Sequence, residues 1–146
     1  MTHEALLRAL TPGAVMWIPA AGNSLWPLLF DGDSLRVERV EAGAPTSKQL
    51  RRGELAVIKR PDGILAAHLV VSVDPLITES TAGVRDPLPL EPLGRVTAFR
   101  RQGRVIPIPG SFALALRWWP LAARVAKRVP LAPTVVRLLR SRSSNR

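Results

Sequence analysis

Residues 54–73 read ELAVIKRPDGILAAHLVVSV, two apolar runs joined by Pro-Asp-Gly. The first run, residues 54–60, is expected to be an alternating strand with one face exposed, and the second, residues 64–73, is long and apolar. A proline-aspartate-glycine connection is typical of a tight turn, so the stretch predicts a β-hairpin. His68 interrupts the second run, although nothing in the packing of an apolar strand calls for an imidazole.

The sequence on either side of this hairpin also favours short strands. Fourteen prolines and ten glycines are scattered without period, which argues against a helical bundle. Apolar patterning predicts strands over residues 14–20 and 34–40, a loop over 41–53, a hairpin over 94–108 around Gln102-Gly103, and a short helix over 2–10. The predicted fold class is therefore mainly β, with a body over residues 1–110.

The end of the chain has a different character. Leu114, Trp118, Leu121 and Val125 recur at helical spacing, and Pro120 would kink or restart such a helix. Residues 92–146 hold 12 basic and no acidic side chains, and the whole chain has a net charge of +10. Residues 111–146 are predicted to form a basic amphipathic helical tail. Its candidate partners are an anionic membrane surface and a partner protein, and packing onto the body is an equal alternative.

Composition excludes several classes of site. Without cysteine the chain has no disulfides, no thiolate metal site and no cysteine-protease nucleophile. Two histidines, His3 and His68, are too few for a histidine-built zinc site, and we expect neither metal nor cofactor. No long uncharged apolar run is present, and the first residues do not resemble a secretory signal. We expect a cytoplasmic protein, peripheral at a membrane if the tail binds lipid.

Residues 20–37, AAGNSLWPLLFDGDSLRV, place a serine in a constrained turn. Gly22 allows an unusual backbone conformation before Ser24, and Pro27 fixes the chain after it. Ser24 is either a nucleophile or part of an ordinary turn. A nucleophilic serine needs a base, for which His68 is the candidate and Lys59 the rival. Alternatively, His68 is a satisfied core residue and Lys59 a solvated strand end.

The serine stretch resembles the nucleophile segment of type I signal peptidases and LexA-type self-cleaving repressors. Gly22, Ser24, Pro27 and the pair Gly32-Asp33 match the pattern of that superfamily, with Leu25 where methionine is usual. The stretch RRGELAVIKRPDGILAAHLVV is similar to the second family segment. In that segment Gly53 matches, Glu54 replaces an aspartate, and the base position falls on His68, as in the endoplasmic-reticulum and archaeal type. Lys59 lies outside the motif.

A third segment, residues 76–99, resembles the region that ends in a Gly-Arg-Val strand. Glu79, Ser80 and Thr81 stand where a basic residue, glycine and aspartate are usual, so one acidic position is lost, whereas Asp86 and Gly94 remain. The resemblance implies that Asp86 orients His68 by accepting its ring N–H. As a plain alternative, Arg85-Asp86-Pro87 is only a turn.

Taken together, the resemblance implies a small signal-peptidase- or LexA-like β-fold and a serine endopeptidase with a Ser24–His68 dyad. Its substrate would be an extended peptide or preprotein segment with small residues before the scissile bond, lying near residues 14–20 and 64–70. Leu25, Trp26 and Pro27 are the candidate substrate contacts. Two rival functions stay open: a catalytically idle, peptidase-like binding protein, and a nucleic-acid-binding module that uses the basic tail. The second is less favoured, because neither a helix-turn-helix nor an aromatic strand platform is found.

Overall fold

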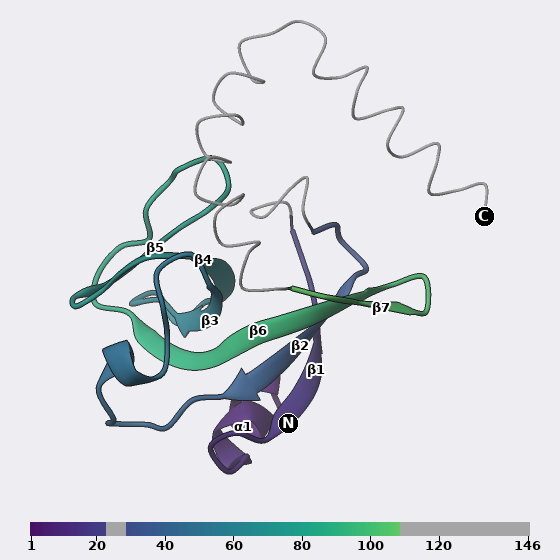
Figure 1. Cartoon of the computed structure of the whole chain (residues 1–146), viewed down its shortest axis with the longest axis horizontal. Coiled ribbons are helices and arrows are strands. Elements are labelled where there is room, and N and C mark those ends of the chain that lie inside the picture. Colours follow the sequence, from purple (N-terminus) through teal and green to yellow (C-terminus); the bar gives the residue numbers. More distant parts are fainter. Residues whose placement is uncertain (23–28, 109–146) are drawn as a thin grey trace, which may run out of the picture.

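A computed structural model describes residues 1–22 and 29–108 of the chain (Figure 1). Its elements are α1 (His3–Ala9), β1 (Val15–Pro19), β2 (Ser34–Arg39), the 3₁₀ helix η1 (Thr46–Lys48), β3 (Leu55–Lys59), β4 (Leu65–Val73), β5 (Leu76–Glu79), β6 (Glu91–Arg101) and β7 (Arg104–Pro107). The mainly β prediction is confirmed. The predicted tail, residues 111–146, lies outside the described residues, and within those residues no helix has the length and hydropathy of a membrane span.

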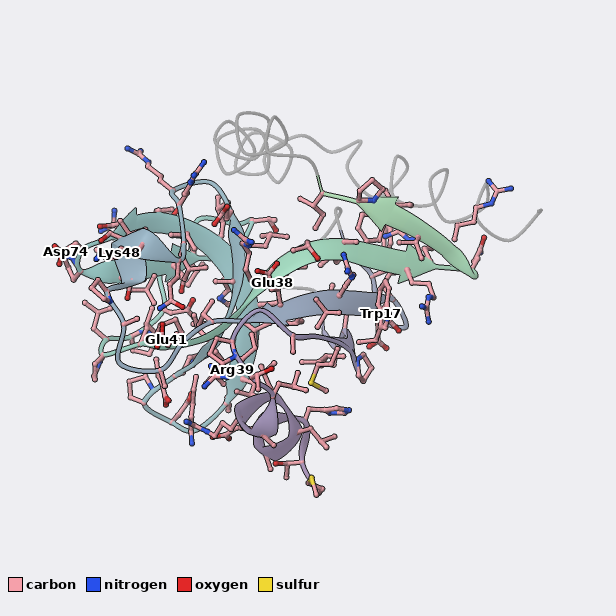
Figure 2. All side chains as sticks on the ribbon, turned by 60° about the horizontal axis from the view of Figure 1, so that its bottom comes forward. Trp17, Glu38, Arg39, Glu41, Lys48 and Asp74 are labelled. Carbon is pink, nitrogen blue, oxygen red and sulfur yellow. The ribbon has the colours of Figure 1, made fainter. Side chains whose placement is uncertain are left out.

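All strand pairs of the described residues are antiparallel and belong to one sheet, in the order β1-β2-β6-β3-β4-β5. β6 pairs with three strands. One of its edges pairs with β2, and the other edge pairs with β3 along the first part of β6 and with β7 along its last part. Figure 1 shows β6 as a long curved strand that links the two halves of the sheet. The ends of the sheet are far apart: Figure 2 places Trp17 of β1 at one end, and Asp74, in the turn after β4, at the other.

Both predicted hairpins are present. In the first, Lys59 pairs with Leu65 across the Pro61-Asp62-Gly63 turn. In the second, Arg101 pairs with Arg104 around Gln102 and Gly103, whose φ angles of 49° and 76° are both positive. Two successive positive φ angles are the mark of a type I′ turn, the two-residue turn whose twist matches that of paired strands. Local turn chemistry therefore sets the register of both hairpins.

The expected alternation in residues 54–60 is wrong. Leu55, Ala56, Val57 and Ile58 are all buried, because β3 lies between β4 and β6 and is covered on both faces. One face contributes to a large cluster of apolar side chains and the other to a smaller one. The large cluster contains Leu7, Ile18, Leu29, Leu35, Val37, Leu55, Val57, Leu69, Leu93, Val96 and Phe99, and the smaller one contains Val40, Leu50, Ala56, Ile58, Val70 and Leu76.

Helix α1 closes the large cluster from outside the sheet. The Thr2 hydroxyl accepts a hydrogen bond from the Ala5 backbone at 3.2 Å and caps the helix N-terminus. Leu7 is completely buried in the cluster. On the outer side, Arg8 bonds Glu91 of β6 at 2.7 Å and Glu4 bonds Lys59 of β3 at 2.8 Å. The predicted helix is thus confirmed, and it is tied to two central strands.

Candidate active site

His68 lies on β4 opposite Ala56 of β3, and only 6% of its surface is exposed. Its Nδ1 atom lies 2.5 Å from Oδ2 of Asp86, which is also buried. A carboxylate can only accept hydrogen bonds, so the tautomer of His68 with a proton on Nδ1 is the one that fits this contact. The structure therefore brings together two of the three predicted catalytic residues, His68 and Asp86.

The turn after β5 places Asp86. The Ser80 backbone bonds Val84 at 3.0 Å, and Glu79 and Arg85 form an isolated β-bridge. Asp86 then returns to β5, where its N–H donates to the Thr78 carbonyl at 3.0 Å. The turn after β5 thus brings the Asp86 carboxylate to His68.

The second ring nitrogen of His68, Nε2, is buried and has no hydrogen-bond partner among the described residues. A buried imidazole nitrogen is normally satisfied by a partner, so an orphaned one calls for an explanation. With Nδ1 protonated, Nε2 carries a lone pair and is the atom that can accept a proton. Within the described residues, Nε2 is therefore a buried ring nitrogen without a hydrogen-bond partner.

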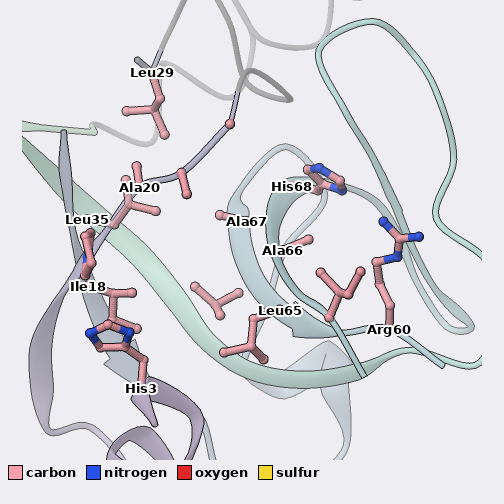
Figure 3. Close-up of a pocket in the computed structure, with 15 residues that line it drawn as sticks. His3, Ile18, Ala20, Leu29, Leu35, Arg60, Leu65, Ala66, Ala67 and His68 are labelled. Carbon is pink, nitrogen blue, oxygen red and sulfur yellow. The ribbon is translucent and has the colours of Figure 1, made fainter. Parts of the chain in front are cut away.

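His68 is part of the wall of a cavity of about 430 Å³ (Figure 3). Figure 3 shows His68 and Arg60 on one side of it, with Ile18, Ala20 and Leu35 on the other. Two extended segments form its long walls, residues 18–22 from the end of β1 and residues 64–68 from the start of β4. Because these walls come from strands at separate places in the sheet, the cavity is a gap between two strand edges.

Both edges have unused pairing capacity in the described part of the chain. β1 pairs with β2 on one side only, and β4 meets β5 only from Leu69 onward. Residues 65–68 therefore pair with β3 alone. An unpaired strand edge offers backbone N–H and C=O groups to an incoming extended chain.

Ser24, Leu25, Trp26 and Pro27 lie outside the described residues. The residues on either side of this segment are described. Gly22 and Leu29 both line the cavity that His68 lines. The base of the loop is closed where Ala20 donates to the Asp33 carbonyl at 2.7 Å.

Asp33, predicted only as part of a glycine-aspartate turn, binds both its own turn and β6. Its carboxylate accepts hydrogen bonds from the Phe30 backbone at 3.0 Å and from Arg101 of β6 at 2.6 Å. Sequence reasoning missed Arg101 because 68 residues separate it from its partner. The contact ties Asp33, next to the start of β2, to the end of β6.

Lys59, the rival candidate for the base, forms an ion pair away from the cavity. It does not line the cavity, and its ammonium group bonds Glu4 of α1 at 2.8 Å. Glu54 accepts a hydrogen bond from the Arg51 backbone at 2.8 Å and closes the turn before β3. Within the described residues, no cluster of histidine and acidic side chains could hold a metal ion.

No family model matches the chain, and a comparison with curated proteins finds no match either.

Proposed function

We propose that this chain is a serine endopeptidase in which Ser24 is the nucleophile, His68 the general base and Asp86 the residue that orients the base. The observation that carries the proposal is the buried His68–Asp86 pair, whose contact atoms are 2.5 Å apart, together with the place of His68 in the wall of a cavity that Gly22 also lines. Ser24 follows Gly22 by two residues in the sequence. His68 Nε2, without a partner among the described residues, is the acceptor that a serine hydroxyl needs.

In the proposed reaction, Ser24 Oγ attacks the carbonyl carbon of the scissile peptide while Nε2 accepts the hydroxyl proton. The tetrahedral intermediate collapses, the C–N bond breaks, and His68 returns the proton to the leaving amine. Water then attacks the acyl-enzyme, with His68 again taking and returning a proton, and the peptide acid and Ser24 are released. Asp86 stays ionised and stabilises the imidazolium formed in each step.

The substrate in this proposal is an extended peptide that lies between the two strand edges. Within the described residues, the edges of β1 and of residues 65–68 are unpaired, and this supports the proposed mode of binding, since a peptide strand can add to either edge by main-chain hydrogen bonds. Small side chains line part of the walls, among them Ala20, Ala66 and Ala67. The substrate class is thus a peptide or preprotein segment in extended conformation.

A single-thiol experiment tests the pairing of Ser24 with His68 without a known substrate. The chain contains no cysteine, so Ser24→Cys creates one thiol. We expect iodoacetamide to alkylate this thiol at lower pH than an ordinary thiol, whose pKa is about 8.5, because a neighbouring imidazolium stabilises the thiolate. In the Ser24→Cys/His68→Ala variant the profile should return to the ordinary one.

The matched control is Ser47→Cys, at an exposed position of η1. Its alkylation profile should not respond to His68→Ala. Peptidase activity itself is read by mass spectrometry after incubation with a peptide library, where cleavages should vanish in Ser24→Ala and in His68→Ala. Two results together would contradict the proposal: an alkylation profile of Ser24→Cys that does not change with His68→Ala, and no peptide cleavage by the wild type. The chain would then be a binding protein and not an enzyme.

A further inference from the structure

One oxygen of the buried Asp86 carboxylate receives two hydrogen bonds. Oδ2 lies 2.5 Å from His68 Nδ1 and accepts a hydrogen bond from the Thr78 hydroxyl at 2.6 Å. Thr78 lies on β5 and is completely buried. Its hydroxyl is the donor in this contact, because an ionised carboxylate has no proton to offer.

Thr78 holds Asp86 at two points, since its carbonyl also accepts the Asp86 backbone N–H at 3.0 Å. On the other side of the carboxylate, Oδ1 faces the Arg60 guanidinium, whose Nε lies 3.9 Å away. The carboxylate is thus enclosed by a hydroxyl, an imidazole and a cation. Valine has nearly the same shape as threonine, so packing alone does not require a hydroxyl at a fully buried strand position.

We propose that Thr78 is a positioning residue that fixes the Asp86 carboxylate and thereby holds His68 in its Nδ1–H tautomer. This inference rests on the proposed function, in which His68 acts as a base through Nε2. A neutral imidazole exists in two tautomers, and the hydrogen bond at one nitrogen decides which of them forms. With a single donor, the carboxylate could rotate away from the ring. The second donor on the same oxygen stops that rotation.

Nuclear magnetic resonance of the full chain with ¹⁵N-labelled histidine tests this directly. The chain has two histidines, so His3→Ala assigns the His68 signals. In wild type we expect the nitrogen shifts of a fixed Nδ1–H tautomer and a low-field Hδ1 resonance. In Thr78→Val the shifts should move toward an average of the two tautomers and the low-field resonance should be lost. Thr78→Ser, which keeps the hydroxyl, should retain both features.

A Thr78→Val protein with wild-type nitrogen shifts and Hδ1 resonance would overturn the proposal. Loss of these signals in Thr78→Ser as well as in Thr78→Val would also overturn it, because the methyl group and not the hydroxyl would then be responsible. Circular dichroism checks folding, and Thr78→Ala replaces the valine variant if that variant unfolds.

The same spectra in a Ser24→Ala background separate the two proposals. They need no peptidase activity, so they can fail while the Ser24→Cys alkylation test succeeds, and the reverse holds too. On a cleaved peptide, Thr78→Val should lower kcat by about 10- to 100-fold with little change in KM, the loss expected for one hydrogen bond to a charged group.

Discussion

Asp33 and Arg101 form a bidentate ion pair. Asp33 immediately precedes β2, and Arg101 is the last residue of β6. Arg101 Nε lies 3.0 Å from Asp33 Oδ1, and Nη2 lies 2.6 Å from Oδ2. The carboxylate is nearly inaccessible, with 5% of the side chain exposed, whereas Arg101 is 27% exposed. Two parallel hydrogen bonds fix geometry better than one contact does. The pair therefore fixes the start of β2 against the end of β6.

Removing the Arg101 guanidinium should lower the stability of the fold. Arg101→Met leaves the Asp33 carboxylate buried without its guanidinium, and we expect the free energy of unfolding to fall by about 2 to 4 kcal/mol. Urea denaturation followed by circular dichroism measures the loss. The matched control is Arg85→Met, because Arg85 is 67% exposed in its pair with Glu79. That variant should lose no more than about 1 kcal/mol, and equal losses in both would contradict the structural role of the Asp33–Arg101 pair.

Gly94 of β6 is needed for the close approach of β2. A β-carbon at this position would lie 2.2 Å from Val37 Cγ1 and 3.0 Å from the Glu38 carbonyl oxygen. Gly94→Ala should therefore lower the thermal midpoint and cost about 2 kcal/mol or more of unfolding free energy, since the strands must move apart. Adding Val37→Ala removes the nearer atom. The double variant should lose less than the sum of the two single losses, and strict additivity would argue against the clash.

The two hairpins show how much local sequence can predict. Pro61-Asp62-Gly63 and Gln102-Gly103 determine their own turns, and the flanking strands follow from apolar patterning. β5 is different: Leu76–Glu79 is a short run that becomes a strand by pairing with β4. The burial of β3 on both faces likewise results from its central place in the sheet, which no local pattern reports.

In the candidate site, too, some features follow from local sequence and others depend on long-range strand pairing. The motifs and their resemblance to a known superfamily bring Ser24, His68 and Asp86 forward, but as residues far apart in sequence. The contact between His68 and Asp86 requires β5 and its turn, which the sequence did not predict. Thr78 and Arg60 attract no notice in the sequence because their importance comes only from which carboxylate they face. Long-range pairing, and not residue type, supplies this part of the site.

Arg8 links stability to pH through two carboxylates. Its hydrogen bond holds the pKa of Glu91 below the ordinary value of 4.5, and the Lys59 and Arg8 hydrogen bonds do the same to the pKa of Glu4. A lowered folded-state pKa stabilises the protein above the unfolded value, and that stabilisation is lost as pH falls through the folded value. Arg8→Met should therefore be less stable than wild type near neutral pH, and the difference should shrink below about pH 4.5.

Urea denaturation at several values between about pH 3 and pH 7 tests this dependence. Arg52→Met serves as the control, because Arg52 is exposed and has no ion pair among the described residues. Its effect should change little across the same range. A difference between wild type and Arg8→Met that stays constant with pH would show that Arg8 acts by packing and not by charge.

Asp86→Asn should separate orientation of the base from folding. An amide nitrogen in place of the Oδ2 carboxylate oxygen can no longer accept both the His68 and the Thr78 hydrogen bonds, and the imidazolium formed in the reaction loses its counter-charge. We expect cleavage of a library-derived peptide to slow by about three to four orders of magnitude. Asp62→Asn is the matched control, because Asp62 bonds Arg60 at 2.8 Å in an exposed turn, and its rate should stay within about tenfold of wild type. Circular dichroism of both variants checks the fold. A folded Asp86→Asn protein with a nearly normal rate would remove Asp86 from the mechanism and leave Ser24 and His68 as a dyad.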